Sequence, residues 1–232
     1  MEDYLVKFES VGLCFKRQSR LMKSKKQKLF WALENVTFEL SKGEVLGIVG
    51  RNGSGKSTIL SIIAGILGPD RGKFFNNNAS AALLSLQAGF VDYLSGRKNI
   101  MISGLLLGMS KAEVLAKIDD IIEFSELGDF IDEPVEAYSA GMKTRLGFST
   151  ALYIQPDILL IDEVLGVGDR KFKEKSYNAL KKKLSGEMAA VIVSHDEEEI
   201  LDLCDRVIWI DQGVCRLSGD PHYVINEMNA SS

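Results

Sequence analysis

The sequence predicts an α/β protein built on a parallel or mixed sheet. Four short, almost wholly apolar runs are typical of strands buried on both faces of such a sheet. These runs span residues 45–49, 158–161, 190–193 and 207–210. A glycine-rich loop follows the first run and leads into a helix-compatible segment, 56–67. The stretch from about 96 to 135 has no such run and favours helix, which indicates a helical subdomain inserted into the α/β core.

The first 45 residues are expected to form β-structure interrupted by a basic insert. A strand is indicated from Val6 toward Phe15, and Val36, Phe38 and Leu40 alternate with polar residues as in a half-buried strand. Between the two strands lies the segment KRQSRLMKSKKQK, residues 16–28, which has seven basic residues and no acidic one.

Two helix starts can be placed from their capping residues. Ser110 and Glu113 make a capping box ahead of an apolar periodic stretch, within the helical insertion. Near the end of the chain, residues 211–213 form a turn signal, and Asp220 followed by Pro221 is a suitable start for a last helix.

Composition excludes several classes of protein. A chain of 232 residues, 46% hydrophobic and 26% charged, can bury a core without disulfides or metal. No apolar run approaches the roughly 18 residues of a membrane span, and the N-terminus has no secretory signal. The cysteines, Cys14, Cys204 and Cys215, lack metal-ligand spacing. They are expected to be reduced thiols of a cytosolic protein.

Charge is unevenly distributed along the chain. Residues 1–30 hold eight basic and three acidic residues, whereas the whole chain has 28 basic and 32 acidic residues and a formal net charge of −4. An acidic body therefore has a basic N-terminal segment, and this argues against broad binding of nucleic acid.

The segment GRNGSGKST, residues 50–58, matches G-x-x-x-x-G-K-[ST] after a strand and before a helix. Its glycines let the backbone N–H groups point at phosphate oxygens, and the helix N-terminus adds positive charge. Lys56 is suited to the β- and γ-phosphates, and Ser57 to Mg²⁺. The predicted nucleotide-binding residues are Gly50, Arg51, Asn52, Gly53, Ser54, Gly55, Lys56, Ser57 and Thr58. The alternative is a glycine-rich turn without this function.

The segment ILLIDE, residues 158–163, places an acidic pair after a buried strand. Asp162 is predicted to reach Mg²⁺, directly or through water, and Glu163 to orient and deprotonate an attacking water. An acidic strand end that simply meets solvent is the alternative, and the phosphate loop upstream weighs against it.

The segment YSAGMKTR, residues 138–145, resembles the L-S-G-G-Q signature of ABC ATPases. With the two motifs above, it makes the chain similar to an ABC-type ATPase subunit. The resemblance implies one ABC ATPase domain over 1–232, with a RecA-like core, an N-terminal antiparallel β-subdomain and a helical subdomain at about 88–155. Ser139 and Gly141 would hold the γ-phosphate of ATP bound to a second copy, in a head-to-tail dimer. A simple Ser-Ala-Gly helix cap is the alternative.

Four further residues match the family pattern less specifically. Gln87 resembles the glutamine that touches Mg²⁺ and senses the membrane partner, and a polar loop residue is the alternative. His195 resembles the histidine that contacts the γ-phosphate. Asp169 ends the segment VLGVGD, which follows Glu163, and resembles the aspartate of the family's D-loop. Phe15 takes the place of the aromatic that stacks on adenine, or is a core phenylalanine.

Other segments resemble one branch of the family, the ATPases that energise export of lipid-linked polysaccharides such as O-antigen, capsule and teichoic acid. These segments are FWALENVTFELSKGEVLGIVG, LQAGFVDYLSGRKNI, YSAGM, IDEVLGVGD and CDRVIWIDQG. The resemblance implies ATP and Mg²⁺, an integral membrane permease as partner, and a peripheral place on the cytoplasmic face of the inner membrane. No C-terminal carbohydrate-binding domain is expected. The basic insert could attract a lipid pyrophosphate or anionic lipid, or be only a solvated loop.

Three other functions remain open from the sequence. A soluble ABC ATPase acting on nucleic acid usually has two ATPase units or a coiled coil, and neither is seen. A P-loop kinase for small molecules needs neither the segment 138–145 nor His195. An ABC importer of small solutes differs only in its partner, and the segments YSAGM and VLGVGD weigh against it because they depart from the general family pattern.

Overall fold

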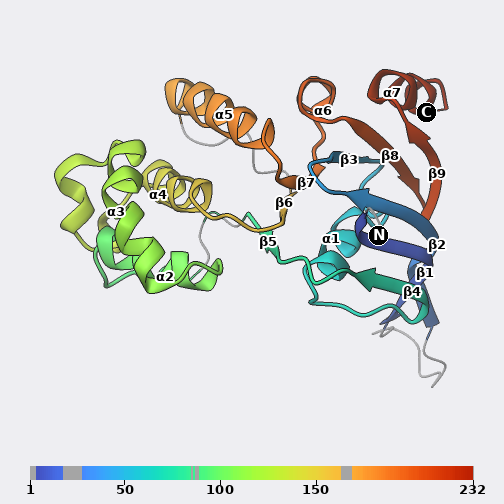
Figure 1. Ribbon diagram of the computed structural model, residues 1–232, viewed down its shortest axis with the longest axis horizontal. Helices are drawn as coiled ribbons and strands as arrows, with labels where there is room; N and C mark the ends of the chain where they lie inside the picture. Colours follow the sequence, from blue (N-terminus) through green and yellow to red (C-terminus); the bar gives the residue numbers. More distant parts are fainter. Residues whose placement is uncertain (1–3, 18–27, 85, 87–88, 163–168, 232) are drawn as a thin grey trace.

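The computed structural model describes residues 4–17, 28–84, 86, 89–162 and 169–231. Its described strands form a nine-stranded sheet in the order β4-β1-β2-β9-β8-β3-β7-β6-β5. Figure 1 shows this sheet on one side of the molecule and a group of helices on the other. The strands are β1 (Tyr4–Arg17), β2 (Lys28–Ser41), β3 (Val45–Val49), β4 (Arg71–Asn76), β5 (Ala81–Leu83), β6 (Ile158–Asp162), β7 (Ala189–Val193), β8 (Arg206–Asp211) and β9 (Val214–Gly219).

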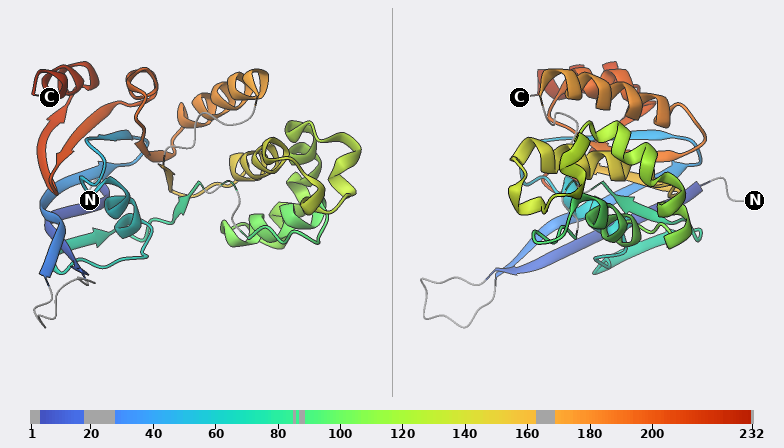
Figure 2. Two further views of the ribbon diagram at one scale, coloured as in Figure 1. Left: turned by 180° about the vertical axis from the view of Figure 1, so that it is seen from behind. Right: turned by 90° about the vertical axis from the view of Figure 1, so that its left-hand side faces the viewer.

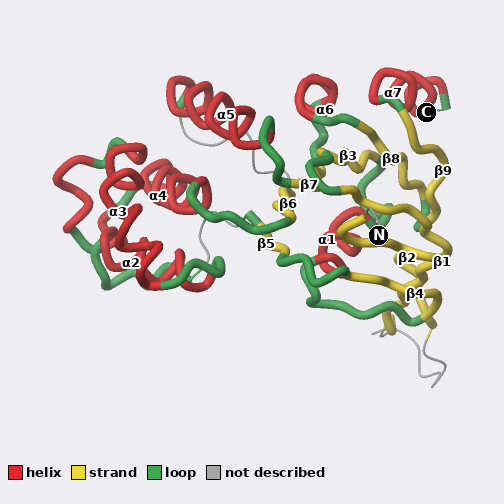
Figure 3. Tube along the Cα trace, viewed as in Figure 1, coloured by secondary structure: helices red, strands yellow, loops and turns green. Residues whose placement is uncertain are grey.

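The helices occupy two places in the fold (Figure 3). They are α1 (Lys56–Ile63), α2 (Gly96–Leu106), α3 (Lys111–Ser125), α4 (Ala140–Leu152), α5 (Arg170–Leu184), α6 (Glu197–Leu203) and α7 (Pro221–Ala230), with 3₁₀ turns η1 (Gly128–Asp132) and η2 (Val135–Ala137). α1, α6 and α7 lie beside the sheet, α2, α3 and α4 form a separate group, and α5 lies next to α4. Among the described residues, no helix is both long and apolar enough to cross a membrane.

The sheet has a parallel and an antiparallel part. β8, β3, β7, β6 and β5 run parallel. β3 and β7 are buried throughout and β6 at all but its last residue, as the apolar runs predict, whereas β5 is half-buried. β4, β1 and β2 pair antiparallel, and β2 joins the rest through the pair Asn35 and Val214 with β9. The predicted mixed α/β architecture with an antiparallel N-terminal part is confirmed.

α1 fills the space between the two parts of the sheet. Its buried face of Ile59, Leu60, Ile62 and Ile63 packs with the alternating apolar residues of β1 and β2 and with one face of β3, β6 and β7. This single core holds the start of α1 rigidly against the sheet. The helix ends at Ile63, earlier than predicted, because the chain turns at Gly65 with φ of 71°.

The group of α2, α3 and α4 has a core of its own. Residues from each helix and from η1 and η2 contribute to it, namely Ile100, Val114, Ile121, Leu127, Ile131, Val135, Tyr138 and Leu146. The predicted capping box is present, since the Ser110 hydroxyl accepts from the backbone N–H of Glu113 and the Glu113 carboxylate from that of Ser110. The left view of Figure 2 shows this group beside the sheet, and in the right view it lies in front of the sheet.

The predicted last helix is also confirmed. It begins after Asp220, whose carboxylate accepts from the backbone N–H of Tyr223, and Pro221 occupies its first turn. β4, β5 and β9 were not predicted. β4 is mostly exposed and β5 is only three residues long, so neither has an apolar pattern of its own.

Candidate nucleotide-binding site

Three parallel strands bring the predicted motifs to one edge of the sheet. Val193 of β7 pairs with Ile48 of β3 on one side and with Asp162 of β6 on the other. These residues therefore stand at one level, next to the carboxyl ends of their strands. The phosphate loop follows β3 and His195 follows β7, so both lie beside Asp162 at the edge where such folds bind ligands.

The phosphate loop, residues 50–58, curls between β3 and α1. Gly50 has φ of 147°, and a Cβ there would lie 2.0 Å from the carbonyl oxygen of Ile210, so only glycine fits. Gly55, with φ of 111°, is the N-cap of α1, and no described side chain caps that helix start. The first N–H groups of α1 are thus left for an anion.

Lys56 and Ser54 make the loop suited to a phosphate group. Lys56 is 6% exposed, and its Nζ donates to the carbonyl oxygens of Gly50, at 2.8 Å, and Arg51, at 3.3 Å. It can exchange these partners for charged phosphate oxygens, which bind an ammonium more strongly. The Ser54 Oγ is buried without a hydrogen-bond partner among the described residues. A phosphate oxygen would supply that partner, so the residues present fit a bound nucleotide.

An aromatic pair lies beside the phosphate loop. Phe15 of β1 and Phe30 of β2 are cross-strand partners, 43% and 48% exposed, and both line a cavity of about 240 Å³. The phosphate-loop and α1 residues that share this cavity include Asn52, Gly53 and Lys56. Phe15 is therefore not a core residue. Phe30 was not predicted, because its place opposite Phe15 depends on the register of strands joined by the insert.

The Mg²⁺ candidates have the right chemistry for an oxygen-bound cation. Ser57 is exposed at the start of α1, and Asp162 is half-buried at the end of β6. No group of three or more histidine, cysteine or acidic residues among the described residues could hold a metal by itself. A hydroxyl and a carboxylate fit the Mg²⁺ preference for few protein ligands together with substrate phosphate and water.

His195 is presented by a braced turn between β7 and α6. The Ser194 hydroxyl donates to the Glu199 carboxylate at 2.7 Å and accepts from the backbone N–H of Asp196 at 3.0 Å. The Asp196 carboxylate caps α6 through the N–H groups of Glu198 and Glu199. These bonds leave the His195 side chain exposed at the sheet edge, lining a cavity with Gly50 of the phosphate loop.

The segment at Ser139 starts α4 on the surface of the helical group. The Ser139 hydroxyl accepts from the backbone N–H of Met142 at 3.2 Å, so it retains its own proton to donate to an anion. A Cβ at Gly141 would meet only the Ser139 Oγ, at 3.8 Å. Glycine inside a helix costs about 1 kcal/mol, and the fold of this chain does not require it there.

Asp169 lies next to this segment. Its carboxylate caps α5 by accepting from the backbone N–H of Phe172 at 3.0 Å, and it forms an ion pair with Arg145 of α4. The Phe172 N–H and then the Arg145 guanidinium hold the pKa of Asp169 below its ordinary value. Ser139, Gly141, Arg145 and Asp169 line a common cavity of about 370 Å³. Glu163 and Gln87 lie outside the described residues, as do residues 18–27 of the basic insert.

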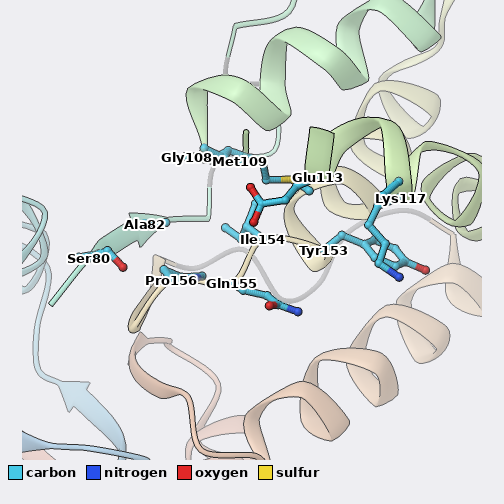
Figure 4. A pocket seen from close by; sticks show the side chains of 13 residues that line it. Ser80, Ala82, Gly108, Met109, Glu113, Lys117, Tyr153, Ile154, Gln155 and Pro156 are labelled. Atoms are coloured by element: carbon cyan, nitrogen blue, oxygen red, sulfur yellow. The ribbon is translucent and has the colours of Figure 1, made fainter. Parts of the chain in front are cut away.

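A further cavity marks the joint between the helical group and the sheet. It has a volume of about 300 Å³, and Figure 4 shows its lining side chains converging from both sides. Gly108, Met109, Glu113, Lys117 and Tyr153 come from the helical group, and Ser80, Ala82 and Pro156 from the region of β5 and β6. Beside this cavity, Phe148 and Ala151 of α4 belong to a buried core that they share with β3, β6, β7 and α5.

Comparison with known sequences gives a consistent family assignment. The sequence profile of the family described as ABC transporter matches residues 33–166. The O-antigen export system ATP-binding protein RfbB of Myxococcus xanthus is 47% identical over 212 residues, 91% of this chain and 47% of that protein. The teichoic acids export ATP-binding protein TagH of Lactococcus lactis subsp. lactis (strain IL1403) is 45% identical over 204 residues, 88% of this chain and 44% of that protein. The chain thus spans about half the length of these two relatives.

A third relative is matched over more of its length. The RfbB protein of Klebsiella pneumoniae is 41% identical over 210 residues, 90% of this chain and 84% of that protein.

Solved structures have the same fold. A dimeric ATP-binding cassette in a post-hydrolysis state, bound to ADP and Pi, superposes with a TM-score of 0.75 at 24% identity, covering 93% of this chain and 98% of that one. An ATP-binding subunit of an ABC transporter superposes with a TM-score of 0.75 at 19% identity, covering 97% of this chain and 93% of that one. At these identities the likeness concerns the fold alone.

Proposed function

The chain belongs to the ABC transporter family, and we propose that it is the ATP-binding and ATP-hydrolysing subunit of an exporter. The substrate that we propose is a lipid-linked polysaccharide of the O-antigen type. The observation that carries the ATPase part is the meeting of the phosphate loop, Asp162 and His195 at one sheet edge. The names of the relatives, which refer to O-antigen and teichoic acid export, support the substrate.

One chain supplies most of a nucleotide site. The phosphate loop and Lys56 bind the phosphates, and the aromatic pair of Phe15 and Phe30 stacks on the base. Ser57 and Asp162, with Gln87, hold Mg²⁺, which supplies charge neutralisation at the phosphates. Glu163 takes the proton of the attacking water, and His195 contacts the γ-phosphate.

A second copy completes the site. Ser139 and Gly141 are exposed at the N-terminus of α4, as required of a cradle for ATP bound to another chain. The glycine that its own fold does not require leaves room for that approaching nucleotide. A head-to-tail dimer with two equivalent sites follows from this arrangement.

Dimer closure moves the helical group relative to the sheet. The group has its own core and a cavity at its joint with the sheet, but α4 also packs against the sheet through Phe148 and Ala151. The motion therefore repacks these contacts of α4 while the core of the group stays intact. ATP drives this motion because it binds the closed dimer more tightly than the open one. We place an integral membrane permease as the partner that receives the motion, with the ATPase held peripherally at the cytoplasmic face of the membrane.

The substrate assignment has two alternatives. An ABC transporter of small solutes would use the same ATPase chemistry, and a soluble ABC ATPase acting on nucleic acid would use no permease. The basic insert at 16–28 fits contact with a lipid pyrophosphate. Neutralising four of its basic residues should lower polymer export at unchanged ATPase rate, and unchanged export would reject that contact.

The ATPase proposal is tested with Glu163→Gln. General-base catalysis contributes about 100- to 10,000-fold, so turnover should fall by at least roughly 100-fold. ATP binding should be retained, and an ATP-dependent dimer should accumulate in size-exclusion chromatography. Glu187→Gln is the matched control, since Glu187 is exposed in the turn before β7. Wild-type turnover by the Glu163→Gln protein would reject the assignment of the base.

The export proposal is tested by co-purification. A tagged chain, expressed with the genes that neighbour its own, should bring down a polytopic membrane protein, and deletion of the chain should leave lipid-linked polymer inside the cell. Recovery of nucleic acid or of a solute-importer permease instead would favour the corresponding alternative.

A further inference from the structure

Glu126 joins two helices beside the exposed segment at Ser139. It is the C-cap that follows α3, and its carboxylate accepts from the Lys175 ammonium of α5 at 2.8 Å. The other carboxylate oxygen pairs with the Arg145 guanidinium of α4 at 3.5 Å. Arg145 in turn pairs with Asp169, the cap of α5. Four charged side chains of alternating sign thus connect the C-terminal end of α3 with the middle of α4 and the first turns of α5.

Each of the two cations, Lys175 and Arg145, also lies near an aromatic ring. The Lys175 Nζ lies 4.4 Å from the ring centroid of Phe124 and also donates to the Phe124 carbonyl oxygen at 2.9 Å. The Arg145 guanidinium lies 5.0 Å from the ring centroid of Phe172. Phe124 and Phe172 pack edge to face with centroids 5.9 Å apart, so the cations share one apolar support.

These contacts are partly withdrawn from water. The side chains of Arg145, Lys175 and Glu126 are 20%, 32% and 34% exposed. Lys175 and other neighbouring cations hold the pKa of Glu126 below its ordinary value, so its carboxylate stays charged to more acidic pH than that of an isolated glutamate. Without this charge, Arg145 and Lys175 would lose their common partner, and two partly buried cations would remain at the same place.

The backbone conformation of Glu126 indicates that its side chain contributes to the stability of the fold. Its φ is 55°, a left-handed conformation that helix ends usually give to glycine. A glycine there would relieve the backbone, so the strain is offset by the ion pairs that only an acidic side chain can make.

Glu126 also lines the cavity formed by Ser139, Gly141, Arg145 and Asp169. We propose that Glu126 is a positioning residue for the nucleotide site of the second copy. By holding Arg145, it fixes Asp169 and the start of α5 against α4, so that the Ser139 segment and Asp169 meet the partner as one rigid face. The inference rests on the proposed head-to-tail dimer.

The experiment uses Glu126→Gln, which keeps the size of the side chain and removes its charge. In the Glu163→Gln background, ATP-dependent dimerisation should weaken by about ten-fold, measured by analytical ultracentrifugation. Affinity of the isolated chain for a fluorescent ATP analogue should change by less than about two-fold, because the phosphate loop is not involved. Glu123→Gln, an exposed position on the same helix, is the matched control and should behave as the parent protein.

A double-mutant cycle separates positioning from simple loss of structure. Lys175→Gln should weaken dimerisation too, and the double variant should lose less than the sum of the two single losses. Glu126→Asp, which restores the charge, should recover part of the dimerisation.

Two outcomes overturn the inference in different ways. If the parent Glu163→Gln protein forms the dimer and Glu126→Gln forms it equally well, Glu126 has no positioning role, whatever the melting temperature does. If the parent protein forms no ATP-dependent dimer, the proposed head-to-tail site fails, and the inference fails with it.

Discussion

The phosphate loop and the segment at Ser139 are both anion cradles at helix N-termini, but they are built differently. In the phosphate loop, Ser54 and Lys56 are 4% and 6% exposed, and the start of α1 lies in the main core. Ser139 and Gly141 are exposed, and they lie on the surface of a helical group with its own small core. One cradle is enclosed by its own chain, and the other faces outward.

This difference indicates which cradle binds the phosphate groups of ATP first. The enclosed loop has a buried ammonium and an unsatisfied hydroxyl, so a phosphate group can bind there without a partner. The exposed cradle has one hydroxyl and one helix end, which in water bind an anion only weakly. It gains strength when a second copy excludes water around it.

The largest expected effect is loss of the enclosed cradle. Lys56→Ala removes a buried ammonium that makes charged hydrogen bonds, worth about 3 kcal/mol or roughly 100-fold in Kd for ATP. Isothermal titration calorimetry on the isolated chain measures this loss. Lys98→Ala, an exposed lysine of α2, should bind ATP like the wild type. Equal affinity of the Lys56→Ala chain would mean that the loop does not bind phosphate.

Loss of the exposed cradle should lower the turnover that depends on the dimer and leave ATP binding by the isolated chain intact. Ser139→Arg places a long side chain where the nucleotide of the second copy would approach, and turnover should fall by roughly 100-fold. ATP affinity of the isolated chain should stay within about two-fold. Ser110→Arg alters the equivalent cap of α3 and should leave turnover unchanged, although it loses the same kind of capping bond. If the isolated Ser139→Arg chain bound ATP more weakly, both cradles would have to serve the nucleotide site of the same chain.

The aromatic pair should give a smaller effect. Phe30→Ala and Phe15→Ala should each raise KM for ATP about five-fold, equal to about 1 kcal/mol of stacking. Inhibition by tripolyphosphate, which has no base, should be unaffected. Leu29→Ala is the control, since Leu29 is 51% exposed and its side chain points to the opposite face of β2. An equal loss with tripolyphosphate would show that Phe30 only supports the loop.

The smallest effect is expected at Ser54, where a substitution should stabilise the free protein but weaken its binding of ATP. Ser54→Ala removes an unsatisfied buried hydroxyl, so the free protein should gain about 1 kcal/mol, or about 2–4 °C in Tm. The same variant should bind ATP a few-fold more weakly. Differential scanning fluorimetry with and without ATP measures both. A lower Tm without ATP would mean that the hydroxyl is already satisfied.

Much of the fold could be predicted from apolar patterns, because β3, β6, β7 and β8 are buried on both faces. β4 could not, since its residues are mostly exposed and it becomes a strand only by pairing with β1. β5 is too short to have a pattern, and its pairing with β6 defines it.

The candidate site divides in the same way. The meeting of the phosphate loop, Asp162 and His195 could be predicted, because carboxyl ends of parallel strands meet at one edge. Phe30 could not, since register across the insert decides its neighbour. The contacts of Glu126 join three helices, and nothing in the local sequence indicates them.

The central claim is that one nucleotide site uses the enclosed cradle of one chain and the exposed cradle of another. It is tested by mixing Lys56→Ala and Ser139→Arg chains, each inactive alone. In a mixed head-to-tail dimer, the wild-type loop of one chain faces the wild-type Ser139 segment of the other. An equal mixture should therefore recover about a quarter of the wild-type ATPase rate. If both cradles served one chain's own site, the mixture would stay as inactive as its components, and that result would contradict the account.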